Sequence, residues 1–470
     1  MARSAFPLFV VGCLLVALAL LGTLALPGCA NIVPPLGGPK DSLPPVLVKA
    51  TPQVGQTGFT SNRITLEFDE YINLDNLLQE LIINPPPERI PDIAGRLKQV
   101  SIKIKDTLKP NTTYSFQFGN AIKDVNENNP FRNFTYVFST GAYIDSLTLG
   151  GTVLNAETGL PDSTMLVILH TSPDDSAVAK EKPRYATRPN GKGQFKFEYL
   201  PAQNFYVFTL KDEGFKRYTS NQTPFGFLGN AVAAGSADSS LLLRFFVNEK
   251  EEPKKTPTLP ERGKKLDDKP ALRYQHTAGS QEQDILSPFS IKFETPLRSW
   301  DSTGLVLTDT LYTPLAGARF TLDTSHKILT LQYPLKPESR YVVLAPKQFA
   351  TDTAGLTTVR ADTIKINTKS EEDYGSVKFS FAGIDTVGTP LLQFVQNDAV
   401  VKTLPIEQGK LQVKLFTPGE YTLRILYDTN GNGKWDTGDY WKKRQPERVD
   451  AISLKCNIRA NWQNEFDITL

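Results

Sequence analysis

Short segments in which apolar and polar residues alternate recur along this chain, and they decide its fold class. Residues 64–68 read Ile-Thr-Leu-Glu-Phe, and residues 100–104 and 114–118 repeat the pattern. A period of two places the apolar side chains on one face of a strand. Turn-forming residues separate these segments, since the 470 residues include 32 glycines and 34 prolines. The sequence therefore predicts an all-β protein of short strands.

Length and charge limit the function classes. A chain of 470 residues has room for about three to five domains. Its 52 Lys+Arg and 50 Asp+Glu residues give a net charge of +2, so no basic face for nucleic acid is indicated. Its histidines, His170, His276 and His326, are far apart and lie in no motif. With no Gly-rich phosphate loop and no nucleophile elbow, we expect a protein that is not an enzyme and binds no nucleic acid.

The N-terminal segment predicts export from the cytoplasm. Arg3 is the only charged residue within 1–28, and an apolar run extends from Phe6 to Leu26. A basic start, an apolar middle and a small residue at the end describe a secretory signal peptide. The alternative is a transmembrane anchor, because about 20 apolar residues are long enough to span a bilayer.

The end of this segment, Leu26-Pro27-Gly28-Cys29, resembles the lipobox of bacterial lipoproteins. The resemblance implies cleavage before Cys29 and a lipid on its thiol that anchors the chain to a membrane. Pro27 departs from the usual pattern. Ala30 follows the cysteine and no acidic run comes after it, which by resemblance to lipoprotein sorting favours the periplasmic side of the outer membrane over the cell surface. Residues 29–43, rich in Pro and Gly, are expected to form an extended tether.

Residues 44–141 carry a second resemblance. Its motifs are Pro44-Pro45, the strand that ends in Phe68-Asp69-Glu70, Leu108 to Tyr114, Ile122-Lys123-Asp124, and the closing Phe138 to Gly141. These motifs resemble the SbsA-type bacterial Ig-like domain, which implies a β-sandwich and says little about activity. With the Pro-Leu-Gly-Gly-Pro-Lys-Asp run before it, the N-terminal third resembles a group of Bacteroidota lipoproteins.

Internal repeats extend this reading to the rest of the chain. Leu335 to Tyr341 matches Leu108 to Tyr114, and Asp352 matches Asp124, so residues 271–369 are expected to form a divergent second Ig-like domain. Two other segments, 145–248 and 373–470, resemble each other and the transthyretin-like or carboxypeptidase-regulatory sandwich. The predicted fold is thus a tandem of Ig-like and transthyretin-like β-sandwiches behind a lipoprotein signal peptide: signal 1–28, tether 29–43, sandwiches 44–141, 145–248, 271–369 and 373–470, and a linker at 249–270.

The linker at 249–270 is charged, contains proline and is almost free of apolar residues. Such a segment cannot bury enough surface to order itself. The two halves of the chain are therefore expected to move relative to each other. In the mature chain only Cys29 and Cys456 remain as cysteines, and Cys456 is expected to be a small buried apolar residue.

One motif indicates a metal. Residues 428–439 read Asp-Thr-Asn-Gly-Asn-Gly-Lys-Trp-Asp-Thr-Gly-Asp, with side-chain oxygens at positions 1, 3, 5, 9 and 12 and glycine at position 6. This spacing resembles the calcium loops of EF-hands and dockerins, although a strand precedes it instead of a helix. The alternative is a hairpin loop that needs no ion. The motif predicts a structural Ca²⁺ site with ligands Asp428, Asn430, Asn432, the Lys434 carbonyl, Asp436 and Asp439.

These features favour a non-enzymatic envelope lipoprotein, a β-sandwich scaffold or a binding and assembly factor for envelope proteins at the outer membrane. The alternative is a glycan-binding or hydrolytic surface protein with a groove between domains. Such a groove would gather carboxylates or tryptophans, of which the chain has Trp300, Trp435, Trp441 and Trp462. Asp69 and Glu70 are expected to form an acidic turn, because adjacent strand residues point to opposite faces.

Overall fold

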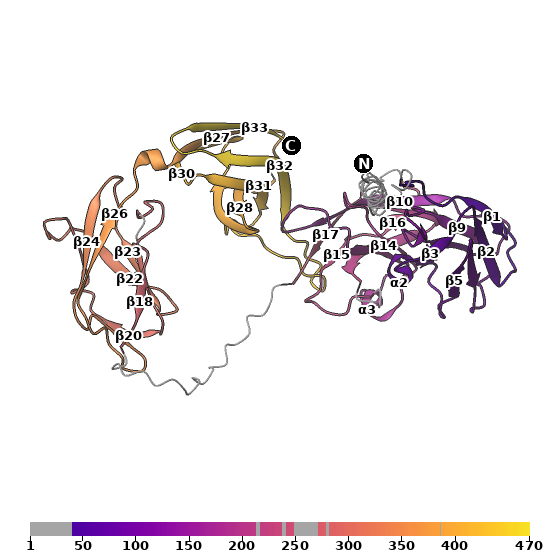
Figure 1. The fold of residues 1–470 in the computed structure, drawn as a ribbon, viewed down its shortest axis with the longest axis horizontal. Helices are drawn as coiled ribbons and strands as arrows, with labels where there is room; N and C mark the ends of the chain where they lie inside the picture. Colours follow the sequence, from indigo (N-terminus) through magenta and orange to yellow (C-terminus); the bar gives the residue numbers. More distant parts are fainter. Residues whose placement is uncertain (1–39, 213–216, 237–240, 249–270, 279–281, 386) are drawn as a thin grey trace, which may run out of the picture.

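The computed structural model describes residues 40–212, 217–236, 241–248, 271–278, 282–385 and 387–470. Regular structure there is almost entirely strand (Figure 1), which confirms the predicted all-β class of tandem sandwiches. The predicted signal peptide, Cys29, most of the tether and the linker lie outside these residues. No helix in the described part of the chain is both long and apolar enough to cross a bilayer.

The first sandwich packs three small sheets around one core. Ile64 and Leu66 from one strand meet Val100 and Ile102 from its neighbour, and all four are fully buried, as the alternating pattern predicts. The sheets are β1 (Leu47–Thr51), β2 (Arg63–Phe68), β6 (Gln99–Lys103) and β5 (Asp92–Arg96); β4 (Ile82–Asn84), β7 (Thr113–Gln117) and β9 (Thr135–Ser139); and β3 (Ile72–Leu74) with β8 (Ile122–Asp124), plus the short helix α2 (Leu77–Glu80).

The third sandwich repeats this arrangement strand for strand. Its sheets are β18 (Tyr274–His276), β19 (Ser290–Phe293), β23 (Ile328–Gln332) and β22 (Arg319–Leu322); β21 (Val306–Thr308), β24 (Arg340–Ala345) and β26 (Asp362–Asn367); and β20 (Leu297–Trp300) with β25 (Ala350–Asp352). The order within each sheet is the order of the first sandwich. The weak repeat in the sequence therefore reflects a shared topology.

The second and fourth sandwiches share another topology, in which the first strand pairs in parallel with the last. In sheet order, the second contains β12 (Tyr185–Thr187), β11 (Met165–His170), β14 (Asn204–Lys211), β15 (Phe225–Phe227), β17 (Leu241–Phe246), β10 (Leu147–Asn155) and β13 (Gln194–Leu200), with β16 (Val232–Ala233) on β14 and helix α3 (Ala177–Lys180). The fourth contains β30 (Lys410–Phe416), β27 (Gly375–Ala382) and β33 (Gln463–Thr469), and a sheet of β29 (Ala399–Pro405), β28 (Thr389–Gln396), β31 (Gly419–Asp428) and β32 (Arg448–Ile458).

A buried amide joins the first sandwich to the second. The Asn84 Nδ2 donates to the Ala186 carbonyl at 2.9 Å, and the Ala186 N–H donates to the Asn84 Oδ1 at 2.8 Å. The side chain thus imitates the pairing of a neighbouring strand at β12. Nearby, the Arg188 guanidinium donates to the Gln79 carbonyl. These contacts hold the two sandwiches end to end (Figure 1).

The third and fourth sandwiches meet at a short 3₁₀ helix, η1 (Glu371–Asp373), and the buried Tyr374 that follows it. The Tyr374 hydroxyl donates to Asp284 at 2.6 Å and accepts the N–H of Ile285 at 3.0 Å. Burial and the hydrogen bond to Asp284 raise the pKa of Tyr374. This neutral hydroxyl therefore ties the start of the fourth sandwich to the third.

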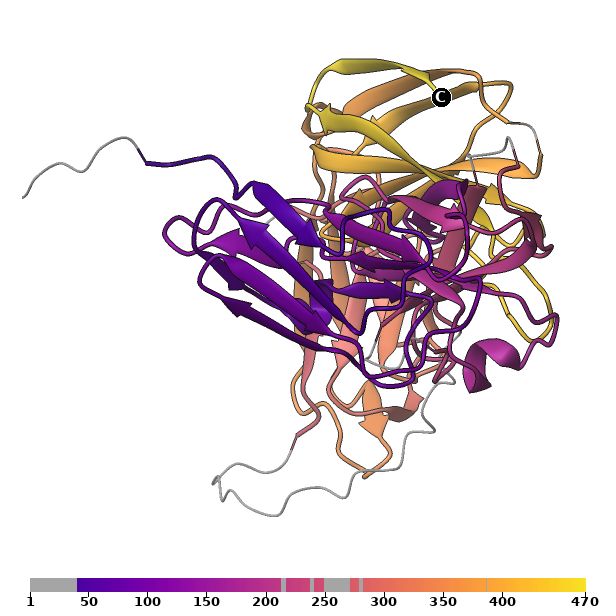
Figure 2. The same cartoon turned by 90° about the vertical axis from the view of Figure 1, so that its right-hand side faces the viewer.

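The fourth sandwich also lies against the second, from which it is separated in sequence by the whole third sandwich. Figures 1 and 2 show the yellow strands of the fourth sandwich beside the magenta strands of the second. The sequence predicts two halves joined only by the linker, so this contact differs from expectation. Its residues belong to the segment with the predicted calcium motif.

Candidate functional site

The predicted calcium loop begins where β31 ends. The Asp428 carboxylate is buried and accepts three backbone N–H groups: Oδ1 from Asn430 at 3.2 Å and Gly431 at 2.7 Å, and Oδ2 from Gly433 at 2.7 Å. Both glycines have positive φ, 77° and 74°, a conformation that costs glycine nothing. The loop therefore wraps around its first residue, with the turn at Gly433 that position 6 requires.

Two asparagines and a second aspartate complete the interior of the loop. The Nδ2 atoms of Asn430 and Asn432 each donate to the Asp436 Oδ2 at 2.7 Å. Their Oδ1 atoms accept the N–H groups of Asn432 and Lys434. The structure thus gathers four predicted ligands through hydrogen bonds within the loop.

The last predicted ligand, Asp439, has its partners elsewhere. Its Oδ1 accepts the N–H groups of Trp441 and Lys442, and its Oδ2 pairs with the Lys442 Nζ at 3.4 Å. Burial opposes ionisation of this carboxyl, but the hydrogen bonds and charge of Lys442 hold its pKa below the usual range. Asp439 therefore serves the turn that follows the loop.

Glu447, which the sequence motif does not include, closes the base of the loop. Its Oε1 accepts the N–H and hydroxyl of Thr429, both at 2.7 Å, and its Oε2 accepts the Asp436 N–H at 3.1 Å. It lies 19 positions after Asp428 and outside the twelve-residue spacing, so pattern reading misses it. Among the described residues, no three Asp, Glu, His or Cys side chains converge in a way that could hold a metal; the loop offers two carboxylates and two amides.

Residues 435–447, here called the strap, begin within the loop and hold the fourth sandwich on the second. Tyr440 is only 2% exposed, although its sequence neighbours are Gly, Asp, Trp and Lys. Its ring centroid lies 5.0 Å from that of Phe225 and 5.1 Å from that of Phe227, edge to face. The surrounding side chains, here called the socket, are Phe208, Tyr218, Phe225, Phe227 and Phe246 of the second sandwich.

Hydrogen bonds surround the Tyr440 side chain, here called the plug of the socket. The Tyr440 hydroxyl donates to the Asp175 carbonyl at 2.9 Å, and the Lys443 ammonium pairs with the Asp175 carboxylate. The Thr437 hydroxyl donates to the Val247 carbonyl at 2.7 Å, and the Gln445 amide to the Phe227 carbonyl at 3.0 Å. The strap is therefore held along its whole length.

The sheet of the fourth sandwich that contains β28 and β31 forms a second area of contact with the second sandwich. The Arg424 Nε donates to the Gln393 Oε1 at 2.7 Å, and both side chains are buried. Burial lowers the pKa of Arg424, and the charge of Glu157 in the second sandwich opposes that shift. A Cβ at Gly159 of the second sandwich would lie 2.6 Å from the Ala451 nitrogen. The two sandwiches are thus in close backbone contact.

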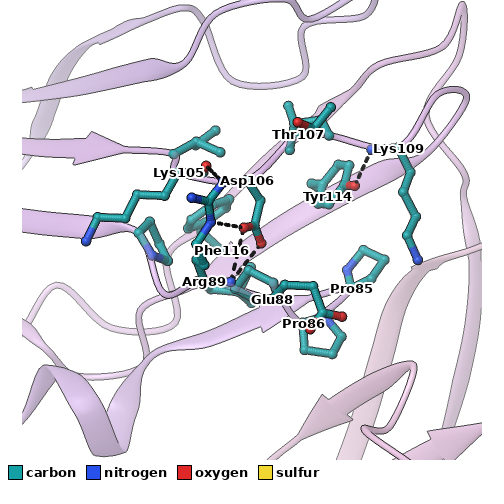
Figure 3. Close-up of a pocket in the computed structure, with 15 residues that line it drawn as sticks. Pro85, Pro86, Glu88, Arg89, Lys105, Asp106, Thr107, Lys109, Tyr114 and Phe116 are labelled. Atoms are coloured by element: carbon teal, nitrogen blue, oxygen red, sulfur yellow. Dashed lines mark hydrogen bonds and ion pairs between the residues drawn. The ribbon is translucent and has the colours of Figure 1, made fainter.

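Two hollows lie near the first sandwich. One, of about 280 Å³, is lined by prolines, Phe116 and the ion pair of Arg89 with Asp106 (Figure 3). The Arg89 backbone N–H also binds Asp106 and holds its pKa below the usual range. Glu88, Lys105 and Lys109 also line this hollow, and ion pairs join Glu88 to Lys182 and Lys105 to Asp92.

The larger hollow, about 800 Å³, is a polar groove between the first and second sandwiches. Two carboxylates line it, but the Glu80 Oε2 accepts the Asn120 N–H at 3.0 Å and Glu198 pairs with Lys196 at 2.6 Å. The remaining polar lining is mainly amides and guanidinium groups: Gln117, Asn120, Asn133, Asn190, Gln194, Arg132 and Arg188. The groove suits hydroxyl-bearing ligands better than acid–base chemistry.

The other residues noted in the sequence do not converge on one site. Trp300 packs on the core of the third sandwich, Trp435 packs on Leu391, Leu426 and Val449, and Trp441 and Trp462 are mostly exposed. Asp69 accepts the Val46 N–H and lies in a turn. Burial and four nearby carboxylates raise the pKa of Glu70.

Cys456 is fully buried, which confirms its expected role as a small apolar residue, and burial raises its pKa to about 12.

Comparison with known proteins finds a family match for part of the chain. The model of the bacterial Ig-like domain matches residues 41–140. A search of the curated proteins finds no match. Among solved structures, the chain is similar to the Bacillus anthracis TIE protein at 10% identity, covering 92% of this chain and 75% of that one, with a TM-score of 0.18.

Two further structures are the S-layer protein rSbsC(31–844), at 10% identity and a TM-score of 0.15, and the BSP domain of a biofilm-associated protein, at 10% and 0.16. The first covers 90% of this chain and 54% of that one, the second 87% and 95%. This chain thus spans about half the length of the S-layer protein. These are distant likenesses, and the match that bears on this chain is that of its first sandwich to the model of the bacterial Ig-like domain.

Proposed function

We propose that this chain is a non-enzymatic lipoprotein that acts as a rigid scaffold or assembly factor at the outer membrane, facing the periplasm. The observation that carries the proposal is how its buried polar groups are used. Asn84, Tyr440 and Tyr374 all join one sandwich to another. A series of sandwiches held in a set arrangement presents surfaces at defined distances from the membrane. The lipid on Cys29 would hold it there.

The anchor is tested by fractionation after metabolic labelling with a radioactive fatty acid. We expect the wild-type chain to carry the label and to sediment with outer-membrane vesicles. Cys29→Ser should lose the label and the sedimentation, while Cys456→Ser should keep both. An unlabelled wild-type chain would overturn the anchor. Protease treatment of intact cells then distinguishes the leaflets, since a periplasmic chain survives until the outer membrane is permeabilised.

Cross-linking before gentle solubilisation tests the scaffold itself. We expect defined envelope proteins to be recovered with the wild-type chain in constant proportion. Recovery of the chain alone, at every cross-linker length, would contradict a scaffold role.

We also propose that residues 428–439 bind calcium in a structural role. The support is the spacing of the motif together with Asp428, which accepts backbone N–H groups of the loop as a first-position ligand does; the amides of Asn430 and Asn432 would have to turn their oxygens toward the ion. The ligands would be Asp428, Asn430, Asn432, the Lys434 carbonyl and Asp436, with Asp439 able to join after a change in the following turn. Two neutral amides indicate modest affinity, roughly 10⁻⁶ to 10⁻³ M.

Thermal unfolding of the chain from Ala30 tests this site. Millimolar calcium should raise the Tm, because an ion that binds only the folded state stabilises it by mass action. Asp428→Ala should abolish the rise, and Asp467→Ala, an exposed aspartate of the same sandwich, should leave it intact. Equal Tm values in calcium and in chelator would contradict the site.

The polar groove between the first two sandwiches favours one alternative, glycan binding. Amides offer both donors and acceptors to sugar hydroxyls, and a cavity of about 800 Å³ lies within the range of ligand sites. Calorimetric titration with envelope oligosaccharides tests it. The double variant Gln117→Ala/Gln194→Ala should bind the glycan more weakly. If its heat of binding equals that of the wild-type chain, the glycan binds elsewhere.

A further inference from the structure

One end of the first sandwich exposes apolar side chains on the segments that connect its strands. They precede β1 and β3, follow β8, or lie in the turn from β5 to β6: Val46, Tyr71, Val125 and Leu97, here called the tip. These strands pair antiparallel with their neighbours, so the four positions lie at the same end. Each side chain is more than half exposed, from 53% for Val125 to 68% for Leu97.

Backbone hydrogen bonds fix the positions of the tip residues. The Asp69 N–H donates to the Val46 carbonyl at 3.1 Å, and the Val125 N–H donates to the Tyr71 carbonyl at 3.1 Å. The N–H of the residue after Tyr71 donates to the Leu97 carbonyl at 2.9 Å. The tip is therefore one surface, held by the backbone of the sandwich.

The third sandwich has the same end without this apolar surface. Its backbone repeats the three hydrogen bonds, at 3.3, 3.1 and 2.7 Å. Leu97 and His326, which correspond to each other, share a φ of 57°. In the order Val46, Tyr71, Val125 and Leu97, the residues of the third sandwich are Arg273, Pro296, Thr353 and His326. The topology therefore does not require apolar side chains at this end, and those of the tip have another use.

The tip lies where the N-terminal segment reaches the first sandwich. The Asn129 Nδ2, in the turn that follows Val125, donates to the Asp41 carbonyl at 3.1 Å. Only ten residues lie between Cys29 and Lys40, so this stretch spans at most about 40 Å when fully extended. A lipid on Cys29 and a transmembrane segment before it would both put a bilayer within that reach.

We propose that the tip inserts its apolar side chains into the surface of the membrane that anchors the chain. This inference rests on the proposed anchor, which brings the tip to the bilayer. Insertion is favourable because it removes exposed apolar area from water. The first sandwich then stands on the bilayer in one orientation, and through Asn84 it directs the second sandwich as well.

The charges around the tip favour a zwitterionic lipid surface over an anionic one. Burial and four neighbouring carboxylates raise the pKa of Glu70, which lies between Asp69 and Tyr71. The Lys98 Nζ, 5.6 Å from the centre of the Tyr71 ring, offsets one of these negative charges. An anionic bilayer repels such a group of carboxylates, whereas phosphatidylcholine carries no net charge.

Sedimentation with phosphatidylcholine vesicles tests the tip in the chain from Ala30, which has no lipid. We expect the unmutated chain to sediment with the vesicles. The triple variant Val46→Arg/Leu97→His/Val125→Thr should bind at least 10-fold more weakly. Its Tm should not change, because the third sandwich has these residues at the same positions. Leu311→Ser, which removes an exposed leucine of the third sandwich, should bind like the unmutated chain.

An environment-sensitive dye locates the contact without the triple variant. Attached to Leu97→Cys, the dye should shift its emission to the blue when vesicles are added. The same dye on Leu311→Cys should not respond, and the buried Cys456 should stay unlabelled. Equal responses at both positions would overturn the proposed insertion of the tip.

The remaining outcomes separate this inference from the proposed anchor. An unmutated chain that stays in the supernatant would overturn the tip, and fatty-acid label on Cys29 would leave the anchor standing. Stronger binding to vesicles that contain phosphatidylglycerol would show that charge and not the apolar tip drives the contact. If the triple variant keeps vesicle binding but changes from dimer to monomer in gel filtration, the tip contacts a second copy of the chain instead.

Discussion

At the scale of single residues, a buried titratable group without a hydrogen-bond partner makes the stability of the folded state depend on pH. His170 is 2% exposed, its Nε2 has no hydrogen-bond partner, and burial lowers its pKa from 6.5 to about 4. Between these pH values the unfolded chain takes up a proton that the folded chain does not. The folded state therefore loses stability as the pH falls from about 6.5 to 4, by up to about 3 kcal/mol.

We predict that His170→Leu flattens this part of the pH profile. An apolar side chain of similar size removes both the titration and the unpaired nitrogen. The decrease in Tm between pH 6.5 and pH 4 should be smaller than in the wild-type chain. His276→Gln, at an exposed position, should leave the decrease unchanged. An identical profile for His170→Leu would show that other groups dominate acid unfolding.

Asn84 offers a second test at this scale. Asn84→Ala leaves the N–H and carbonyl of Ala186 without the partners they have in the structure. The cost should be about 2–4 kcal/mol, because buried backbone groups become unpaired. Hydrogen exchange at Ala186 should speed up accordingly while exchange in β6 stays slow. Asn120→Ala, whose side chain is exposed, is the matched control, and equal exchange at Ala186 in both variants would contradict the role of Asn84.

At the scale of elements, the two Ig-like sandwiches share a corner that the sequence repeat only indicates. The hydroxyls of Tyr114 and Tyr341 accept the N–H groups of Lys109 and Lys336, at 2.9 Å and 3.0 Å. In each sandwich a threonine hydroxyl near the last strand donates to the same lysine's carbonyl at 2.7 Å. The motif from Leu108 to Tyr114 is thus a packing device, and its recurrence at 335–341 has a physical cause.

Removing either corner hydroxyl should have the same effect. Tyr114→Phe and Tyr341→Phe each lose one hydrogen bond at a partly exposed backbone N–H, so each should cost about 1 kcal/mol. Calorimetry should show a lower Tm for the sandwich concerned. Tyr312→Phe, at an exposed position, should show no change. A large loss in one sandwich and none in the other would mean that the two corners are not equivalent.

Strands could be predicted where one face packs on the core of its own sandwich. Residues 64–68 and 100–104 alternate because their neighbours lie a short distance away in the same sandwich, and they form β2 and β6. Contacts between sandwiches leave no such period. Asn84 and Ala186 are 102 positions apart, and Tyr440 lies in a segment of polar and turn-forming residues in which its burial is not distinguished from the exposure of its neighbour Trp441. Glu447 lies beyond the span of the calcium motif.

At the scale of the whole molecule, the fourth sandwich returns to contact the second, although the third sandwich lies between them in sequence. The linker at 249–270 leaves the second sandwich, and the strap brings the fourth sandwich back to it. The aromatic side chains of the socket and the buried Arg424 of the fourth sandwich both lie at this contact. Two connections therefore hold the halves, one covalent and one through packing, and either alone should suffice to keep them together.

Limited proteolysis separates these two connections. The composition of 249–270 predicts first cleavage there, and the strap predicts that the two fragments remain associated and elute as one particle in gel filtration. Tyr440→Ala removes the plug, so its fragments should elute separately after the same cut. Trp462→Ala should behave like the wild-type chain. Fragments of the wild-type chain that separate at once would show that the strap is too weak to hold the halves, and cleavage inside a sandwich before the linker would contradict the domain boundaries themselves.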